Sequence, residues 1–467
     1  MDKNLLNINS KKNIFLTIIF LSLFFHFFFY YFRNDHNIIT FDSWEYLALA
    51  ESLRNNFSYS IDNVLQMNRG PGYPIFIFIS KLFYNNNISV ILLQIFIYTV
   101  SLLMITDIVL KINKYFTKKK LFFFIIFLVI NIYSINYNFL IMSESFYSFC
   151  IVFSLWSLTI KEKNAKKKLF FNTSKLGFFL FGVSSSVCIL TRQVSLMSYS
   201  IFFLLVFLSI LIIDKKNFFN YLKNISFFLI SFFLILSIWC IRNYVYFKDE
   251  ILINQNATII GYKTNISTYN HYYDKRFKKY LFSNDQPFFM IRPYQKPVSV
   301  NYKYKDEKKD VEYAFSKLEN DIKISKLSFA NDSTLDFFEK IAKKRFEADP
   351  LLYFTAPFSR AIKLLFSPRI GAIDQKGETG YSTSNFKFLT LFLLNLIYLI
   401  IFIQGLIYLL REKLFLNREN FYTLLSILFV FSFVIGHLYS YSVLFPFAQS
   451  RYLIPVIPLY LIFFRIK

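Results

Sequence analysis

Glycine, cysteine and histidine are all scarce in this chain of 467 residues, which contains 10 Gly, 3 Cys and 4 His. The few glycines form neither a glycine-rich phosphate loop nor a G-x-S-x-G nucleophile turn, which excludes the common nucleotide-binding and serine-hydrolase motifs. The cysteines lie in apolar runs without metal-ligand spacing, and the histidines are scattered, so no zinc site is predicted. We expect no cofactor, and the sequence carries no signal for a divalent metal. The cysteines are Cys150, Cys188 and Cys240, and the histidines are His26, His36, His271 and His437.

Acidic residues are also few: 29 Asp and Glu stand against 53 Lys and Arg, giving a formal net charge of +24. A basic balance of this size can indicate a nucleic-acid partner. Here, however, the lysines concentrate in short segments between long apolar runs, such as the segment from Lys111 to Lys120. Basic residues in such segments orient membrane helices by the positive-inside rule. We therefore expect membrane lipids as partners and no nucleic acid.

Hydrophobic residues make up 55% of the chain, and runs such as Ile14 to Tyr31 are long enough to cross a bilayer. The sequence predicts an all-α polytopic membrane protein with about ten transmembrane helices. The basic N-terminus before the first run, with no cleavage site after it, predicts a signal-anchor helix. The charge bias places both termini in the cytoplasm and the chain in the plasma (inner) membrane. The expected spans are 14–32, 88–112, 121–138, 146–160, 169–190, 196–213, 221–241, 386–410, 421–439 and 452–464.

Three domains follow from this pattern. Residues 1–243 form an N-terminal membrane core whose first outer loop is 33–87, and residues 386–467 form C-terminal membrane helices. Between them, 244–385 is an extracytoplasmic, mainly helical cap, with amphipathic helices expected at 310–326 and 335–347 and an apolar helix at 351–366. The apolar run 75–84 is too short to span and is expected to lie on or dip into the membrane face.

The first outer loop gathers ionisable residues directly after a long apolar span. Asp42 and Glu45 stand three apart, which favours a capping box in which Asp42 caps the helix and Glu45 reaches back. A compatible hypothesis is that Asp42 accepts a proton from a hydroxyl group, positioned by Glu45 or by Glu144. Arg69, before Gly-Pro-Gly-Tyr-Pro, indicates either a simple turn or a guanidinium presented to a phosphate.

Other charged candidates also map to the outer side. Glu144, in a short outer turn, reads equally well as a solvated charge or as a second functional carboxylate. Arg192, Arg242 and Arg451 each sit at a span end, where arginine commonly snorkels to the interface. Their joint occurrence on the outer side, against the usual bias, favours phosphate binding, because arginine pairs bidentately with phosphate and keeps its charge.

The ordered set of motifs resembles bacterial GT-C glycosyltransferases, the relatives of dolichyl-phosphate-mannose protein mannosyltransferases and lipid A aminoarabinose transferases. The resemblance runs almost the whole length. One departure stands beside Asp42, where Ser43 replaces the acidic residue that many members carry. The matching segments are Asp42-Ser43-Trp44-Glu45-Tyr46, Arg69 to Pro74, Ser143-Glu144-Ser145, Leu190-Thr191-Arg192, Trp239 to Tyr244 and Arg451-Tyr452-x-x-Pro455-x-x-Pro458.

The resemblance implies transfer of a sugar from a polyprenyl-phosphate donor, with inversion, to a lipid, glycan or protein acceptor. Asp42 matches the catalytic first-loop aspartate and Glu144 the acidic position of the second outer loop, with Glu45 as a helper. The expected substrate-binding residues are Tyr46, Arg69, Tyr73, Arg192, Arg242 and Arg451. Alternatives are a transporter or flippase of lipid-linked sugars, a non-catalytic polysaccharide assembly or scaffold protein, and a polymerase or ligase using a diphosphate-linked donor.

Overall fold

The computed structural model describes most of the chain outside the long hydrophilic segment. The described residues are 8–32, 38–66, 69–112, 117–161, 173–213, 215, 218–247, 304–325, 332–351, 358, 361, 364–365, 385–411, 421–444 and 450–463.

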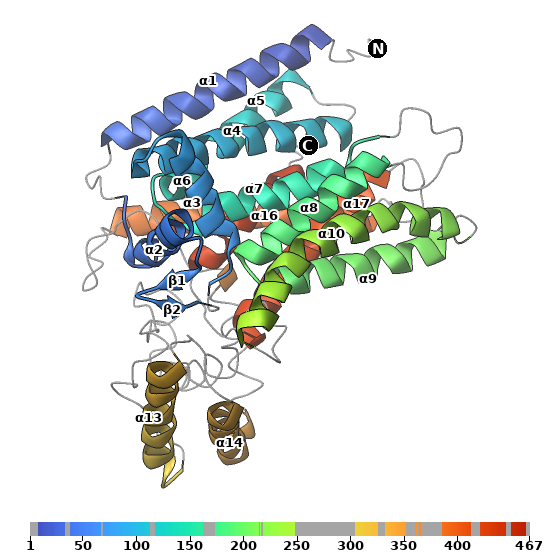
Figure 1. Ribbon diagram of the computed structural model, residues 1–467. Coiled ribbons are helices and arrows are strands. Elements are labelled where there is room, and N and C mark those ends of the chain that lie inside the picture. The colour runs from blue at the N-terminus through green and yellow to red at the C-terminus, as the bar shows by residue number, and fades with distance from the viewer. Residues whose placement is uncertain are drawn as a thin grey trace.

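A bundle of long apolar helices forms the body of the protein (Figure 1). The outward faces of these helices carry large apolar side chains; on the first helix, Phe20 is 69% exposed and Phe27 is 72% exposed. A surface of this kind is stable against lipid rather than water, and the chain is an all-α membrane protein. The bundle helices are α1 (Ile8–Phe32), α4 (Asn87–Ile112), α7 (Ser143–Leu158), α8 (Lys175–Thr191), α9 (Ser195–Ile213), α10 (Phe218–Phe247), α16 (Asn385–Arg411) and α17 (Phe421–Tyr439).

Within the described residues, five helical segments are long and apolar enough to cross a membrane. They are Lys11–Phe32, Asn87–Ile112, Ser195–Ile212, Lys223–Tyr246 and Thr423–Ser442. A sixth arises if α5 (Lys118–Val129) and α6 (Ile132–Asn138), bent by 41°, count as one broken span. The prediction of an all-α membrane protein is thus confirmed, but the described residues provide five or six candidate spans rather than about ten.

Two of the expected spans are interrupted for local reasons. The third breaks because the Asn131 side chain accepts the N–H of Ser134 at 3.3 Å and so begins a new helix, α6. The tenth is a succession of short turns, η6 (Ser450–Val456), α18 (Ile457–Tyr460) and η7 (Leu461–Phe463). Pro455 and Pro458 lie within it, and proline removes the backbone donor that a regular helix needs.

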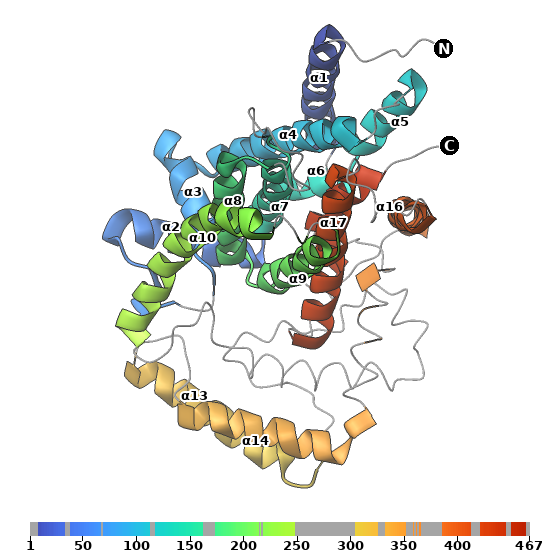
Figure 2. The same cartoon turned by 90° about the vertical axis from the view of Figure 1, so that its right-hand side faces the viewer.

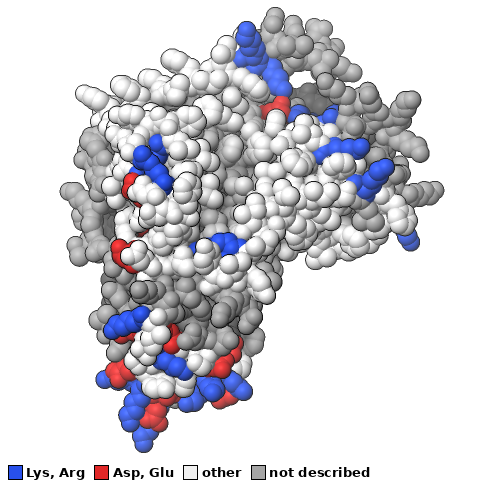
Figure 3. Space-filling view, viewed as in Figure 1, with Lys and Arg blue, Asp and Glu red and all other residues white. Residues whose placement is uncertain are grey.

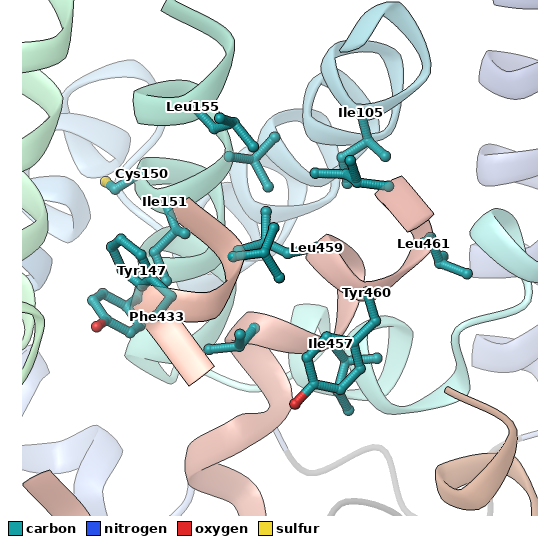
Figure 4. Packing of buried hydrophobic residues seen from close by; sticks show 14 of the residues in the cluster. Ile105, Tyr147, Cys150, Ile151, Leu155, Phe433, Ile457, Leu459, Tyr460 and Leu461 are labelled. Atoms are coloured by element: carbon teal, nitrogen blue, oxygen red, sulfur yellow. The ribbon is translucent and has the colours of Figure 1, made fainter. Parts of the chain in front are cut away.

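This irregular C-terminal segment fills the centre of the bundle. Ile457, Leu459 and Leu461 are fully buried and pack among apolar side chains from α4, α7 and α17 (Figure 4). The segment therefore serves as core rather than as a lipid-facing span.

One end of the bundle is tied together by an acid inside α4. Asp107 accepts hydrogen bonds from Lys11 at 2.6 Å and from the Trp156 indole at 3.0 Å, and its carboxylate lies 2.7 Å from Lys111. These contacts join α1, α4 and α7 at the end where the basic loops were predicted. The segments predicted to lie outside, among them the first loop, gather at the opposite end of the bundle (Figure 1).

At that opposite end lie α2 (Phe41–Asn56), a small hairpin of β1 (Ser60–Ile61) and β2 (Val64–Leu65), and α3 (Gly72–Phe83) (Figure 1). Asp62 and Asn63 both have positive φ, as the turn of a two-residue hairpin requires. The helix in the first loop extends from Phe41 and so includes Asp42.

The hydrophilic segment contains α13 (Glu307–Ser325) and α14 (Asp332–Ala348), close to the expected bounds, whereas most of 351–366 lies outside the described residues. These helices pack side by side, away from the bundle (Figures 1 and 2). A buried ion pair joins them, with Arg345 Nη1 2.5 Å from Glu307 Oε1. Charged side chains are dense over this pair, whereas on the bundle they form separate small patches in a mostly uncharged surface (Figure 3).

Candidate functional site

The N-terminus of α2 presents Asp42 but does not use it as a cap. Thr40 is the N-cap residue, and its backbone N–H donates to Ser43 Oγ at 2.8 Å. The expectation that Asp42 caps this helix with Glu45 reaching back is therefore wrong. The helix begins two residues earlier than that pattern required, so the Asp42 side chain is available for other contacts.

Asp42 and Glu45 instead share one guanidinium group. Arg69 Nη2 lies 3.0 Å from Asp42 Oδ1, and Arg69 Nε lies 2.7 Å from Glu45 Oε2. The Asp42 side chain is 5% exposed, and the Arg69 guanidinium carbon lies 5.3 Å from the centre of the Tyr46 ring. The Arg69 side chain is 34% exposed, so it is the Asp42 carboxylate that burial would leave uncompensated without this close hydrogen bond.

Two glycines allow Arg69 to reach this position. A Cβ atom on Gly70 would lie 2.0 Å from the carbonyl oxygen of Leu190, and one on Gly72 would lie 2.3 Å from Thr191 Oγ1. The loop therefore rests directly on the last residues of α8, closer than any side chain would permit. Arg192 follows immediately in the chain, so the same contact brings together the backbone segments that carry Arg69 and Arg192.

Arg192 forms the second acid–guanidinium pair. Its Nη2 lies 2.6 Å from Glu144 Oε1, and Glu144 is only 1% exposed. The interpretation of Glu144 as a solvated charge is therefore wrong, because this residue opens α7 inside the protein. Arg192 also donates to Ser143 Oγ at 3.1 Å and to the Tyr441 hydroxyl at 3.4 Å.

Aromatic residues connect the two pairs. The Tyr46 hydroxyl donates to Ser143 Oγ at 3.5 Å, and the Tyr46 ring meets Tyr73 edge-on at 4.9 Å between centroids. Ser143 also accepts from Arg192, so one hydroxyl group touches both halves of the site. Six predicted site residues are thus brought together with Tyr73 at their side: Asp42, Glu45, Tyr46, Arg69, Glu144 and Arg192.

Arg242 holds the hairpin. Its guanidinium donates to the backbone oxygens of Gln66 at 3.0 Å and Tyr59 at 3.3 Å, and its carbon lies 4.8 Å from the Trp239 ring centre. Arg451 lies on the backbone of η6, but its side chain is outside the described part of the structure.

The charge of Arg69 is secured by its surroundings. Burial alone would lower the pKa of Arg69, but Tyr46, Asp42 and Glu45 together raise that pKa well above its ordinary value. Burial, with Tyr46, raises the pKa of Tyr59 well above its usual range, so its hydroxyl stays protonated. The Tyr59 hydroxyl donates to the backbone oxygens of Arg69 at 3.0 Å and Gly70 at 3.1 Å and so holds the loop in place.

Two contributors to the site were not among its predicted residues: Tyr441, which carries no recognisable signal in the sequence, and Tyr452, which entered only as part of the motif that begins at Arg451. Tyr441 and Tyr452 stack with ring centroids 4.2 Å apart, and Arg192 lies 5.6 Å from the centre of the Tyr452 ring. Tyr441 belongs to a π-helical turn, η5 (Ser440–Leu444), of the kind often found at functional sites. Among the described residues, no three His, Cys, Asp or Glu side chains gather so as to hold a metal ion.

The site belongs to an all-α membrane protein, and comparison of the chain with known proteins takes the assignment no further. No protein-family model, no curated protein and no solved structure matches it.

Proposed function

We propose that the protein is a membrane glycosyltransferase that moves a sugar from a polyprenyl-phosphate donor to an acceptor hydroxyl group, with inversion. The observation that carries the proposal is the pairing of the candidate base with a guanidinium, Arg69 Nη2 lying 3.0 Å from Asp42 Oδ1. A base beside a fixed positive charge is what an attack on a phosphate-linked carbon needs. The work would take place on the outer face of the plasma membrane, with both termini in the cytoplasm.

In this mechanism the acceptor O–H gives its proton to the Asp42 carboxylate as its oxygen attacks the anomeric carbon. The bond from that carbon to the phosphate oxygen breaks, and the electron pair stays on the phosphate. Arg69 and Arg192 neutralise the charge that develops, an effect that is strong in a site shielded from water. Arg242, bound to the hairpin backbone, would act mainly by shaping the loop beside them.

A competing function is that of a transporter or flippase for a lipid-linked sugar. The break between α5 and α6 favours it, since broken helices line the binding sites of many transporters. In that case labelled lipid-linked sugar would move between leaflets without any glycosidic bond forming. A polymerase or ligase would be recognised by competition from diphosphate-linked donors.

The test compares two Asp→Asn variants within the same loop. Asp42→Asn should lower transfer from polyprenyl-phosphate-linked sugar by about 100- to 10,000-fold, the usual contribution of a general base. Asp62→Asn is the matched control, because Asp62 is exposed and asparagine tolerates its positive φ of 50°. Protein in nanodiscs is assayed with labelled donors, and surface glycans and lipids are analysed by mass spectrometry with and without the protein. Near-normal transfer by Asp42→Asn would remove this residue from the mechanism.

A further inference from the structure

The turn Asn138–Met142, which leads into Ser143 and Glu144, is bound by neighbouring segments through its backbone carbonyls as well as through the side chains of Asn138 and Met142, which contact His26 and Thr40. Gln94, fully buried on α4, donates from Nε2 to the oxygens of Asn138 at 3.0 Å and Leu140 at 2.9 Å. Its Oε1 accepts from the Tyr73 hydroxyl at 2.7 Å. Both N–H groups and the oxygen of this amide are therefore engaged between the turn and α3.

Ser43 holds the same turn from the other side. It is fully buried, and its Oγ donates to the oxygen of Ile141 at 2.9 Å. The Ile141 N–H in turn donates to the oxygen of Ile38 at 3.0 Å. Ser43 follows Asp42 directly in the chain, so this hydrogen bond links the candidate base to the segment that carries Glu144.

We infer that Gln94 and Ser43 are positioning residues that together fix the turn Asn138–Met142 and so set the separation of the two acid–guanidinium pairs. Gln94 ties the turn to the tyrosine that packs against Tyr46. Ser43 ties it to the first turn of α2. With both hydrogen-bonded contacts in place, Asp42 and Glu144 cannot shift independently. The Ser43 hydroxyl makes a hydrogen bond that a carboxylate at this position could not make, because a carboxylate cannot donate to a carbonyl oxygen.

Hydrogen exchange tests this positioning role of Gln94 and Ser43 without reference to any activity. Ser43→Ala and Gln94→Met should each speed exchange of the amides of the turn by about 5- to 30-fold, the factor expected from losing one or two buried hydrogen bonds. Ser186→Ala is the matched control, because Ser186 Oγ also donates across helices to a carbonyl, that of Phe232 at 2.8 Å. Unchanged exchange in the turn in both test variants, or an equal increase in the control, would overturn the inference.

The consequence for chemistry rests on the proposed function and is measured separately. A shift of about 1 Å in a catalytic group can cost about 100-fold in rate, so Ser43→Ala should lower kcat for sugar transfer while donor KM stays unchanged. Ser186→Ala should keep normal kcat even if its melting temperature falls as far as that of Ser43→Ala. If the turn loosens but kcat is normal, the positioning role fails. If wild-type protein shows no transfer while the turn still responds, only the proposed function fails.

Discussion

Replacing Arg192 with methionine isolates the energetic role of the buried pair that opens α7. The substitution leaves the Glu144 carboxylate, 1% exposed, without the guanidinium that lies 2.6 Å away. Removing one partner of a buried ion pair costs about 3–5 kcal/mol, mostly because the remaining charge is stranded. We expect a loss of this size in the free energy of unfolding.

The reverse substitution should be milder. In Glu144→Gln the Arg192 side chain, 12% exposed, keeps the hydroxyl groups of Ser143 and Tyr441 and the neighbouring tyrosine rings. The free energy of unfolding of Glu144→Gln should fall by about 1.5–3 kcal/mol, the contribution of a hydrogen bond to a charged group. The double variant should be more stable than Arg192→Met alone, because no stranded carboxylate remains.

The measurement is unfolding in mixed micelles, followed by far-ultraviolet circular dichroism as SDS is added. Arg54→Met serves as the control, because Arg54 makes an exposed hydrogen bond to Asn85 and its loss should fall within about 0.5 kcal/mol. The reasoning is refuted if Arg192→Met costs no more than this control. It is equally refuted if the two single losses simply add in the double variant.

Two further outcomes follow from the contacts described above. Gly70→Ala should cost about 1–3 kcal/mol, as overpacking does, because its Cβ would meet the backbone oxygen of Leu190 at 2.0 Å; an unchanged melting temperature would show that the loop can move aside. In the α13–α14 pair, the hydrogen bond from Lys344 lowers the pKa of Asp310 below its ordinary value of 3.8. The ionised Asp310 therefore stabilises the folded pair above pH 3.8, and this stabilisation is lost as the pH falls through the lowered pKa. Hydrogen exchange of α13 and α14, corrected for intrinsic rates, should therefore rise at acid pH in the wild type and less steeply in Asp310→Asn.

The extent of the helices was largely predictable from hydropathy. The span expected at 421–439 has the bounds of α17, and that expected at 386–410 matches α16 to one residue at each end. The break at Asn131 was not predictable, because one polar residue barely changes the mean hydropathy of a run. Whether it caps a new helix depends on which neighbours pack around it.

The gathering of charged residues was predictable in outline, since alternating spans bring every second loop to one end. The pairing within the gathering was not. Asp42 could have faced any of several arginines, and the contacts of the Arg69–Gly70 loop with the end of α8 and with Tyr59 place Arg69 there. Likewise, nothing in the sequence distinguished Arg242, which binds backbone carbonyls, from Arg192, which binds a carboxylate.

The contact between Gly70 and Leu190 also constrains how the protein is made. The first loop leaves the ribosome long before α8 is synthesised, yet its resting place is the end of that helix. Until α8 is inserted, the loop lacks the surface on which Gly70 rests, and its carboxylates and arginine stay apart from Arg192. The two acid–guanidinium pairs can therefore come together only after α8 has been inserted, about 100 residues further along the chain.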